Sequence, residues 1–170
     1  IKDIAKQNGI SVIHRPPELA QDETSMKDVL KHFIETKNIS CNEDVTLLYL
    51  TYPERTWKDV ENIYDHFSTI EEKSLVCCEE VQEHPYLCFH ERENNKAELI
   101  VDHKFYRRQD YPSCLRLSMF VACYTVDIVD ELHNLMFEKN THFYKLQKHK
   151  VDVDYLDQFL IIAEQETKQK

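Results

Sequence analysis

Glycine is nearly absent from this chain of 170 residues, in which Gly9 is the only one. Average usage is about 7%, and an α/β nucleotide-binding domain normally has a glycine-rich loop that lets bare backbone approach phosphate. The chain therefore either does not bind a nucleotide in that way or has such a loop in a part that is not included here. Residue 1 is isoleucine, and the chain begins inside a predicted helix. We therefore expect that an N-terminal segment is missing.

An excess of basic residues and long apolar runs are also lacking. The net charge of −10 argues against a nucleic-acid-binding surface, because phosphate contacts need clustered Lys and Arg. No apolar run approaches membrane-spanning length, and no segment looks like a signal peptide. The six cysteines, at positions 41, 77, 78, 88, 114 and 123, have no regular disulfide spacing. We predict reduced thiols, a cytoplasmic location, and neither a membrane nor a nucleic acid as partner.

The remaining composition is that of a single globular domain over residues 1–170, with 42% hydrophobic and 31% charged residues. Apolar runs predict strands, and apolar residues at helical spacing predict helices. The predicted strands are 10–13, 45–50, 74–78, 115–125 and 142–146, and the predicted helices are 1–8, 26–34, 57–67 and 126–138. Strands that alternate with helices indicate an α/β fold with a mostly parallel sheet and right-handed crossovers.

Residues 80–112 interrupt this alternation. Two short apolar runs, 86–90 and 99–101, flank the polar stretch 91–95, which predicts a β-hairpin. A hairpin arm inserted into an α/β domain often reaches a partner subunit. We therefore predict a single domain in which residues 80–112 form a dimerisation arm.

The stretch Val151–Asp154 alternates valine with aspartate. A strand there would bury both valines and turn both carboxylates to the opposite face, and helical spacing begins at Tyr155. Paired carboxylates at the end of a strand suit Mg²⁺, which usually takes one or two protein carboxylates and completes its shell with water and phosphates. The alternative is a solvated turn without a metal.

Ligands of open α/β sheets bind beyond the carboxyl ends of the strands. Polar clusters follow three of the predicted strands. These are His14-Arg15 with Gln21-Asp22, Thr51 to Arg55, and Asp152 with Asp154. Together with Arg108 and Arg116 they would form a pocket for an anion and a metal, because an arginine can hold a carboxylate or phosphate through two parallel hydrogen bonds.

Four segments in order, RPPELAQDETS, LLYLTYPERTWKDVE, YRRQDYPSCLR and VDVDYLDQFLIIAE, resemble the acylneuraminate cytidylyltransferase family of CMP-sialic acid synthetases. The family's second motif reads roughly Leu-Leu-Gln-Pro-Thr-Ser-Pro-Leu-Arg-Thr, of which Thr51, Pro53, Arg55 and Thr56 are kept. The resemblance covers nearly the whole chain. It implies a Rossmann-like nucleotidyltransferase fold, a homodimer built through the arm, and Mg²⁺-dependent coupling of CTP to an acidic sugar with release of pyrophosphate.

The resemblance also implies roles for individual residues. Asp152 and Asp154 match the catalytic, metal-binding aspartates, and Arg15, Thr24 and Ser25 match residues around the nucleotide. The positions that match the sugar site are Tyr49, Thr51, Arg55, Arg108, Gln109 and Arg116. Several of these residues could instead have purely structural roles. Arg108 can pair with acidic groups on the surface, Arg55 can support the following helix, and Tyr49 can be a core aromatic.

Departures from the family pattern favour a second hypothesis. The family's glycine-rich loop has no counterpart, Tyr49 stands where the family has glutamine, and Met119 and Phe120 replace small residues. The sugar pocket would be reshaped, or the chain would be a non-catalytic member that acts as a dimerising binding protein. Zinc at Cys77, Cys78, Cys88 and the nearby histidines lacks a Cys-x-x-Cys spacing, so buried thiols are the better interpretation.

Overall fold

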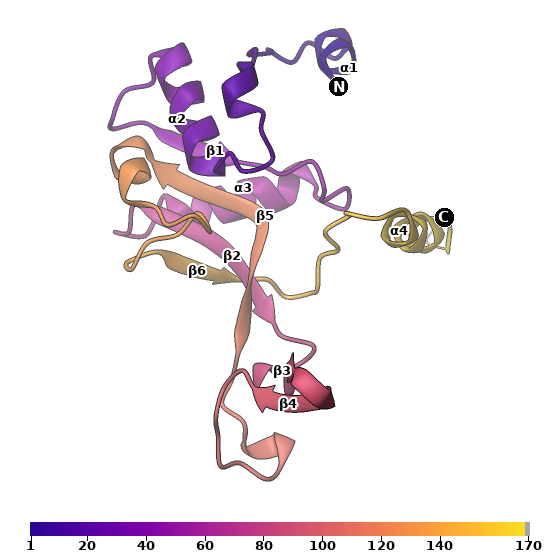
Figure 1. The fold of residues 1–170 in the computed structure, drawn as a ribbon. Coiled ribbons are helices and arrows are strands. Elements are labelled where there is room, and N and C mark those ends of the chain that lie inside the picture. Colours follow the sequence, from indigo (N-terminus) through magenta and orange to yellow (C-terminus); the bar gives the residue numbers. More distant parts are fainter. Residues whose placement is uncertain (169–170) are drawn as a thin grey trace.

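The computed structural model describes residues 1–168 and has a four-stranded sheet at its centre (Figure 1). The strands, in spatial order, are β1 (Asp44–Leu47), β5 (Leu115–Thr125), β2 (Ser74–Glu80) and β6 (His142–Lys145). The bounds of β5 are those predicted, and the core of β2 was predicted too. The fold is therefore mixed α/β.

The predicted mostly parallel sheet is wrong. β5 pairs antiparallel with both β1 and β2, and only β2 and β6 are parallel. The reason lies between β2 and β5, where the chain runs out and back through the arm without a helical crossover and so returns antiparallel. β1, β2 and β6 nevertheless point the same way. Their carboxyl ends and the amino end of β5 share one edge of the sheet.

One helix packs on each face of the sheet, and each begins at a predicted cap. In α2 (Met26–Lys37), the Ser25 hydroxyl accepts a hydrogen bond from the Asp28 backbone N–H. In α3 (Trp57–Phe67), Thr56 and Asp59 form a reciprocal capping box. The two apolar clusters follow the alternation of the strands. The cluster under α3 includes Ile63, Phe67, Leu75 and Cys123, and the cluster under α2 includes Leu30, Val76, Tyr124 and Met136.

Residues 80–112, called the arm below, project from the sheet (Figure 1). The arm contains the predicted hairpin as β3 (Phe89–Arg92) and β4 (Lys96–Leu99), which pair antiparallel. Asn94 and Asn95 supply the left-handed backbone of its turn. Below the hairpin, the Tyr86 ring stacks on the His103 ring at 4.4 Å between centroids. The arm thus has a small aromatic core of its own.

Three other expected elements differ from the structure. Residues 10–13 are not a strand, and the predicted helix 126–138 is a 3₁₀-helix at Val126–Glu131 only. Residues 151–154 form an extended loop rather than a strand. The terminal helices are α1 (Lys2–Gln7) and α4 (Leu156–Lys168). Within residues 1–168, no helix is long and apolar enough to cross a membrane.

Candidate functional site

A cleft of about 510 Å³ opens at the shared edge of the sheet. The segment after β2, the start of β5, the loop after β6 and the first turn of α4 all contribute to it. The lining residues are Val81, Gln82, Glu83, Arg116, His149, Val151, Asp152, Asp154 and Gln158. Of the residues predicted for the site, the cleft brings together Arg116, Asp152 and Asp154.

The loop after β6 is held in place by the segment that follows β1. The Val151 N–H donates to a Glu54 carboxylate oxygen at 3.4 Å, and the Val153 N–H donates to the Thr51 carbonyl at 2.8 Å. Asp152 lies between these two contacts, so its backbone position is fixed from both sides. Although residues 151–154 lack a strand partner, the N–H groups of Val151, Val153 and Asp154 are paired with side-chain and loop acceptors.

The two aspartates differ in environment. Asp152 is half-buried, and its Oδ1 is buried without a hydrogen-bond partner among the described residues. Burial and the negative charge of Asp152 raise the pKa of Tyr49. Asp154 is exposed at the start of α4, where its N–H and that of Tyr155 both donate to Gln158 Oε1. One carboxylate is therefore enclosed, and the other is open to solvent.

These carboxylates fit a magnesium ion better than a metal that needs a complete protein shell. Within the described part of the chain, no group of three or more His, Cys, Asp or Glu side chains could hold a metal. Mg²⁺ needs only one or two carboxylates when phosphates and water complete its shell. The unpartnered Oδ1 of Asp152 is an oxygen ligand of the kind this ion takes.

Arg116 faces the cleft from β5, directly across from Glu79 on β2. Its Nε donates to Glu79 Oε1 at 2.8 Å, and its Nη2 bonds the same oxygen. Glu79 also binds the loop after β6, because Oε2 accepts from His149 Nδ1 at 2.9 Å and from the Lys150 N–H at 3.2 Å. Sequence reasoning missed Glu79 and His149. A glutamate that continues the buried run of β2 was the signal available for the first.

Arg55 does not line the cleft but supports it through hydrogen bonds to the backbone. Its Nη1 donates to the Phe120 carbonyl and its Nη2 to the Tyr49 carbonyl, each at 2.7 Å. Burial lowers the pKa of Arg55. Thr51 offers its carbonyl to the loop after β6, while its buried hydroxyl has no partner among residues 1–168. Phe120 is fully buried in the core and does not line the cleft.

The residues predicted to bind the nucleotide lie outside this cleft. Arg15 is exposed in the segment before α2. The Thr24 hydroxyl donates to the Glu18 carbonyl at 3.5 Å, and the Ser25 hydroxyl caps α2 and donates to Asp28. In this structure, both hydroxyls therefore serve local turns of the chain.

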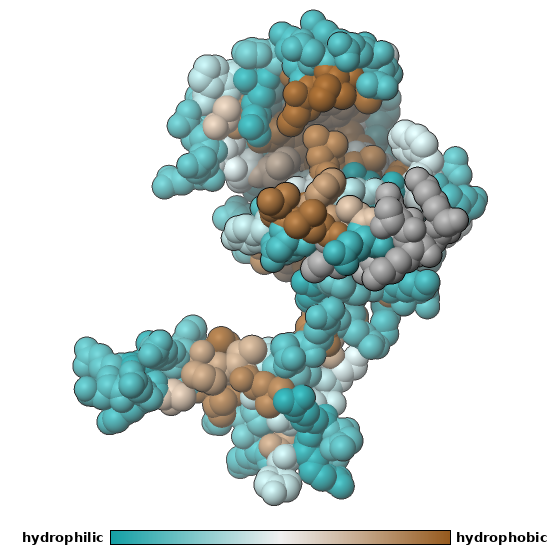
Figure 2. Space-filling model, turned by 90° about the vertical axis from the view of Figure 1, so that its right-hand side faces the viewer, coloured by the Kyte–Doolittle hydropathy of each residue, from teal (hydrophilic) through white to brown (hydrophobic). Residues whose placement is uncertain are grey.

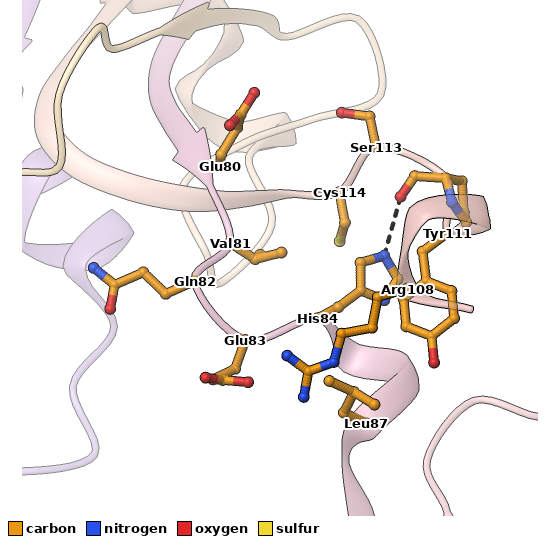
Figure 3. A pocket seen from close by; sticks show the side chains of 11 residues that line it. Glu80, Val81, Gln82, Glu83, His84, Leu87, Arg108, Tyr111, Ser113 and Cys114 are labelled. Atoms are coloured by element: carbon orange, nitrogen blue, oxygen red, sulfur yellow. Dashed lines mark hydrogen bonds between the residues drawn. The ribbon is translucent and has the colours of Figure 1, made fainter. Parts of the chain in front are cut away.

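The two arm residues predicted for the sugar site also lie outside the cleft. Arg108 reaches into a second cavity, of about 320 Å³, at the base of the arm beside His84 and Tyr111 (Figure 3). Residues 81–83 line both cavities. Gln109 is exposed in the 3₁₀ turn Arg108–Asp110.

Comparison with known proteins agrees with the resemblance stated from the motifs. No family model matches the chain. Three curated proteins, the N-acylneuraminate cytidylyltransferases of Streptococcus agalactiae serotypes V, III and Ia, are each 28% identical to it over 166 residues. The match covers 94% of this chain, which spans 38% of the length of each relative. The resemblance to acylneuraminate cytidylyltransferases is therefore confirmed.

Proposed function

We propose that this chain is part of a cytidylyltransferase that couples CTP to an acidic sugar of the nonulosonic acid type. The observation that carries the proposal is the cleft, whose lining brings together Arg116, Asp152 and Asp154. The similarity to N-acylneuraminate cytidylyltransferases supports the same activity. An anion-binding arginine in one cleft with two carboxylates suits a reaction between an acidic sugar and a metal-bound triphosphate.

In this reaction, the anomeric hydroxyl oxygen of the sugar bonds to the α-phosphorus of CTP. The bond from that phosphorus to the oxygen bridging to the β-phosphate breaks, pyrophosphate leaves with the electron pair, and the hydroxyl proton passes to solvent. Positioning and charge neutralisation dominate such transfers. Asp152 and Asp154 would hold Mg²⁺, which offsets phosphate charge when bound. Arg116, with a side chain that is 48% exposed, would orient the sugar carboxylate.

The test is pyrophosphate release by the full-length protein that contains this chain, given CTP, N-acetylneuraminic acid and Mg²⁺. Asp154→Asn should abolish turnover and leave the melting temperature unchanged, because Asp154 is exposed and the substitution keeps its shape. Asp157→Asn, in the first turn of α4, is the matched control and should remain active. Undiminished release by Asp154→Asn would contradict the proposal.

A second candidate function is a non-catalytic, dimerising binding protein. The observation that favours it is that Arg55 is bound to two backbone carbonyls and so is not free for a ligand. This alternative predicts no saturable binding of CTP in the presence of Mg²⁺. Micromolar binding in a calorimetric titration of the full-length protein would exclude it and favour the enzyme.

We further propose that the arm pairs with a second copy of the chain. Its surface carries an apolar patch (Figure 2), although the protein as a whole is strongly charged. The exposed apolar residues of the arm are Phe89, Leu99, Ile100, Val101, Phe105 and Tyr106. Contiguous exposed apolar surface of this kind is typical of protein interfaces.

A further inference from the structure

Glu79 is a buried carboxylate at the end of β2, and only 4% of its side chain is exposed. Moving an ionised carboxylate out of water is costly unless charged and hydrogen-bonding partners replace the solvent. The predicted roles of the site residues give Glu79 no task, and the proposed chemistry does not use it. Its burial behind Arg116 and His149, which line the cleft, therefore needs an explanation.

The contacts of Glu79 divide between its two oxygens. Oε1 accepts from Arg116 Nε at 2.8 Å and from Arg116 Nη2, so this oxygen holds the guanidinium on β5. Oε2 accepts from His149 Nδ1 at 2.9 Å and from the Lys150 N–H at 3.2 Å, so this oxygen holds the loop after β6. The same Nδ1 of His149 lies 3.3 Å from Arg116 Nη2, so the carboxylate, the guanidinium and the imidazole form one cluster.

The two groups that Glu79 holds both belong to the lining of the cleft. Arg116 and His149 line it, and Asp152, which also lines it, follows Lys150 by two residues. The loop also contacts β5 directly, because His149 Nδ1 lies 3.3 Å from Arg116 Nη2 and the Lys150 ammonium lies 5.0 Å from the centroid of the Phe120 ring. Glu79 reinforces this junction, since it is the group that accepts hydrogen bonds from Arg116 through one oxygen and from the loop through the other.

We propose that Glu79 is a positioning residue that fixes the distance between the Arg116 guanidinium and the Asp152 carboxylate. The inference rests on the proposed function, since these two groups need a fixed separation only if they bind the two substrates of one reaction. Small displacements of such groups lower rates strongly. Glu79 itself does not line the cleft.

The first experiment measures steady-state kinetics of Glu79→Gln in the full-length protein. Glutamine keeps the volume but replaces one acceptor oxygen with an amide NH₂, so it cannot accept from both sides. The KM for the sugar acid should rise about tenfold or more, and the KM for CTP should stay within about twofold. Glu80→Gln is the matched control, because Glu80 is the next residue, lies on the surface with Lys145, and should leave both values unchanged.

A double-mutant cycle separates positioning from general destabilisation. In an Arg116→Ala background, the contact that Glu79 organises is already lost, so Glu79→Gln should add less than about a twofold effect on kcat/KM. If the effects of the two substitutions instead multiply in full, the inference is wrong. A loss of activity in Glu79→Gln that is equal for both substrates would also contradict it.

Hydrogen exchange tests the inference independently of activity. Glu79→Gln should increase amide exchange in residues 149–153, whereas Glu80→Gln should not, and unchanged exchange in Glu79→Gln would overturn the proposal. If the wild-type protein transfers no CMP, the proposed function fails, but this measurement still decides whether Glu79 holds the loop. If Glu79→Gln does not fold, His149→Ala provides a second exchange test, because it removes the loop's side-chain contact with Glu79, together with its 3.3 Å contact with Arg116, and retains the hydrogen bonds between Arg116 and Glu79 Oε1.

Discussion

At the scale of single residues, Arg55 shows how one guanidinium can hold a site together without facing it. Its two terminal nitrogens bind carbonyls of the segment after β1 and of β5. A lysine is a point charge and cannot donate in that forked geometry. Arg55→Lys should therefore lower the free energy of unfolding by roughly 2 kcal/mol, since hydrogen bonds to charged groups contribute about 1.5–3 kcal/mol each.

Urea denaturation followed by circular dichroism measures this change. Arg107→Lys is the control, because Arg107 pairs with Asp110 on the exposed surface of the arm and should change stability by less than about 0.5 kcal/mol. If the two variants are equally stable, the carbonyl contacts of Arg55 do not contribute as argued.

Two core thiols make stability depend on alkaline pH. Burial raises the pKa of Cys77 to about 12 and that of Cys123 to about 11, whereas an unfolded thiol has a pKa of about 8.5. The unfolded chain therefore loses these protons first as pH rises. Their stabilising contribution is complete below about pH 8.5 and is lost as pH rises toward 11 and 12.

Urea midpoints between pH 8 and 11 test this dependence and should fall steadily. Cys77→Ala should flatten the slope, although it also lowers stability at every pH by leaving a small cavity. Cys41→Ala, at an exposed position, should leave the slope unchanged. A slope identical in all three proteins would show that ionisation of Cys77 does not govern it.

At the scale of elements, the capping box of α3 links sequence to stability directly. Thr56 accepts from the Asp59 N–H, while the Asp59 carboxylate accepts from the N–H and hydroxyl of Thr56. Thr56→Ala should cost about 1 kcal/mol. Thermal or urea unfolding measures this loss of stability. The control is Thr36→Ala, at an exposed position inside α2, which should leave the stability unchanged.

The capping box formed by Thr56 and Asp59 should also make the folding stability of the protein depend on acidic pH. Burial alone would raise the pKa of Asp59, but hydrogen bonds from Thr56 outweigh it and lower the pKa. A lowered folded pKa gives stability that is present above the unfolded value of about 3.9 and is lost as pH falls below it. Thr56→Ala should lose less stability between pH 5 and 3 than the wild type does, and an equal loss would contradict this account.

Local signals of this kind explain which elements could be predicted. The caps at Ser25 and Thr56, together with helical spacing, located α2 and α3, and the long apolar run located β5. The direction of β5 could not be predicted, because it depends on the path of the arm between two distant strands. Residues 151–154 have the alternation of a strand, yet two of their N–H groups pair with Glu54 and Thr51. No local sequence pattern predicts those distant partners.

The candidate site can be compared with the sequence in the same way. Asp152 and Asp154 were expected from the resemblance and from the end of a strand that the structure replaces with a loop, and Arg116 was expected from the resemblance. The structure places all three in the lining of one cleft. Glu79 and His149 were missed because their importance comes from contacts across 37 and 70 positions of the chain. Arg55 is the opposite case. The sequence suggested it as a ligand for an anion, but in the structure its guanidinium is bound to backbone carbonyls.

At the scale of the whole molecule, the sheet and the arm would divide the two proposed tasks, substrate binding at the cleft and association with a second copy of the chain. Three strands and the start of β5 bring polar groups to one edge, where the cleft lies. The arm begins at this same edge, because it leaves from the end of β2 and returns at the start of β5. A partner bound to the arm would therefore lie next to the cleft, and association and activity should be coupled.

Replacing an apolar pair on the arm with an ion pair tests the proposed association. Phe89 and Leu99 are cross-strand partners in the hairpin, and both are exposed. Phe89→Lys combined with Leu99→Glu removes apolar surface but retains an attractive pair across the strands, so the hairpin should persist. Each lost apolar side chain contributes about 1.5–3 kcal/mol when buried, so the dimer dissociation constant should rise roughly 100-fold or more.

Light scattering coupled to size-exclusion chromatography of the full-length protein measures the molar mass across a range of concentrations. The control exchanges the charges of the ion pair Arg92–Glu98 in the same hairpin, and this variant should remain dimeric. A wild-type monomer at every concentration, or an unchanged dimer in the Phe89 and Leu99 variant, would exclude the arm as the interface. If the variant is monomeric and also loses activity while the charge exchange retains it, the cleft depends on the neighbouring subunit.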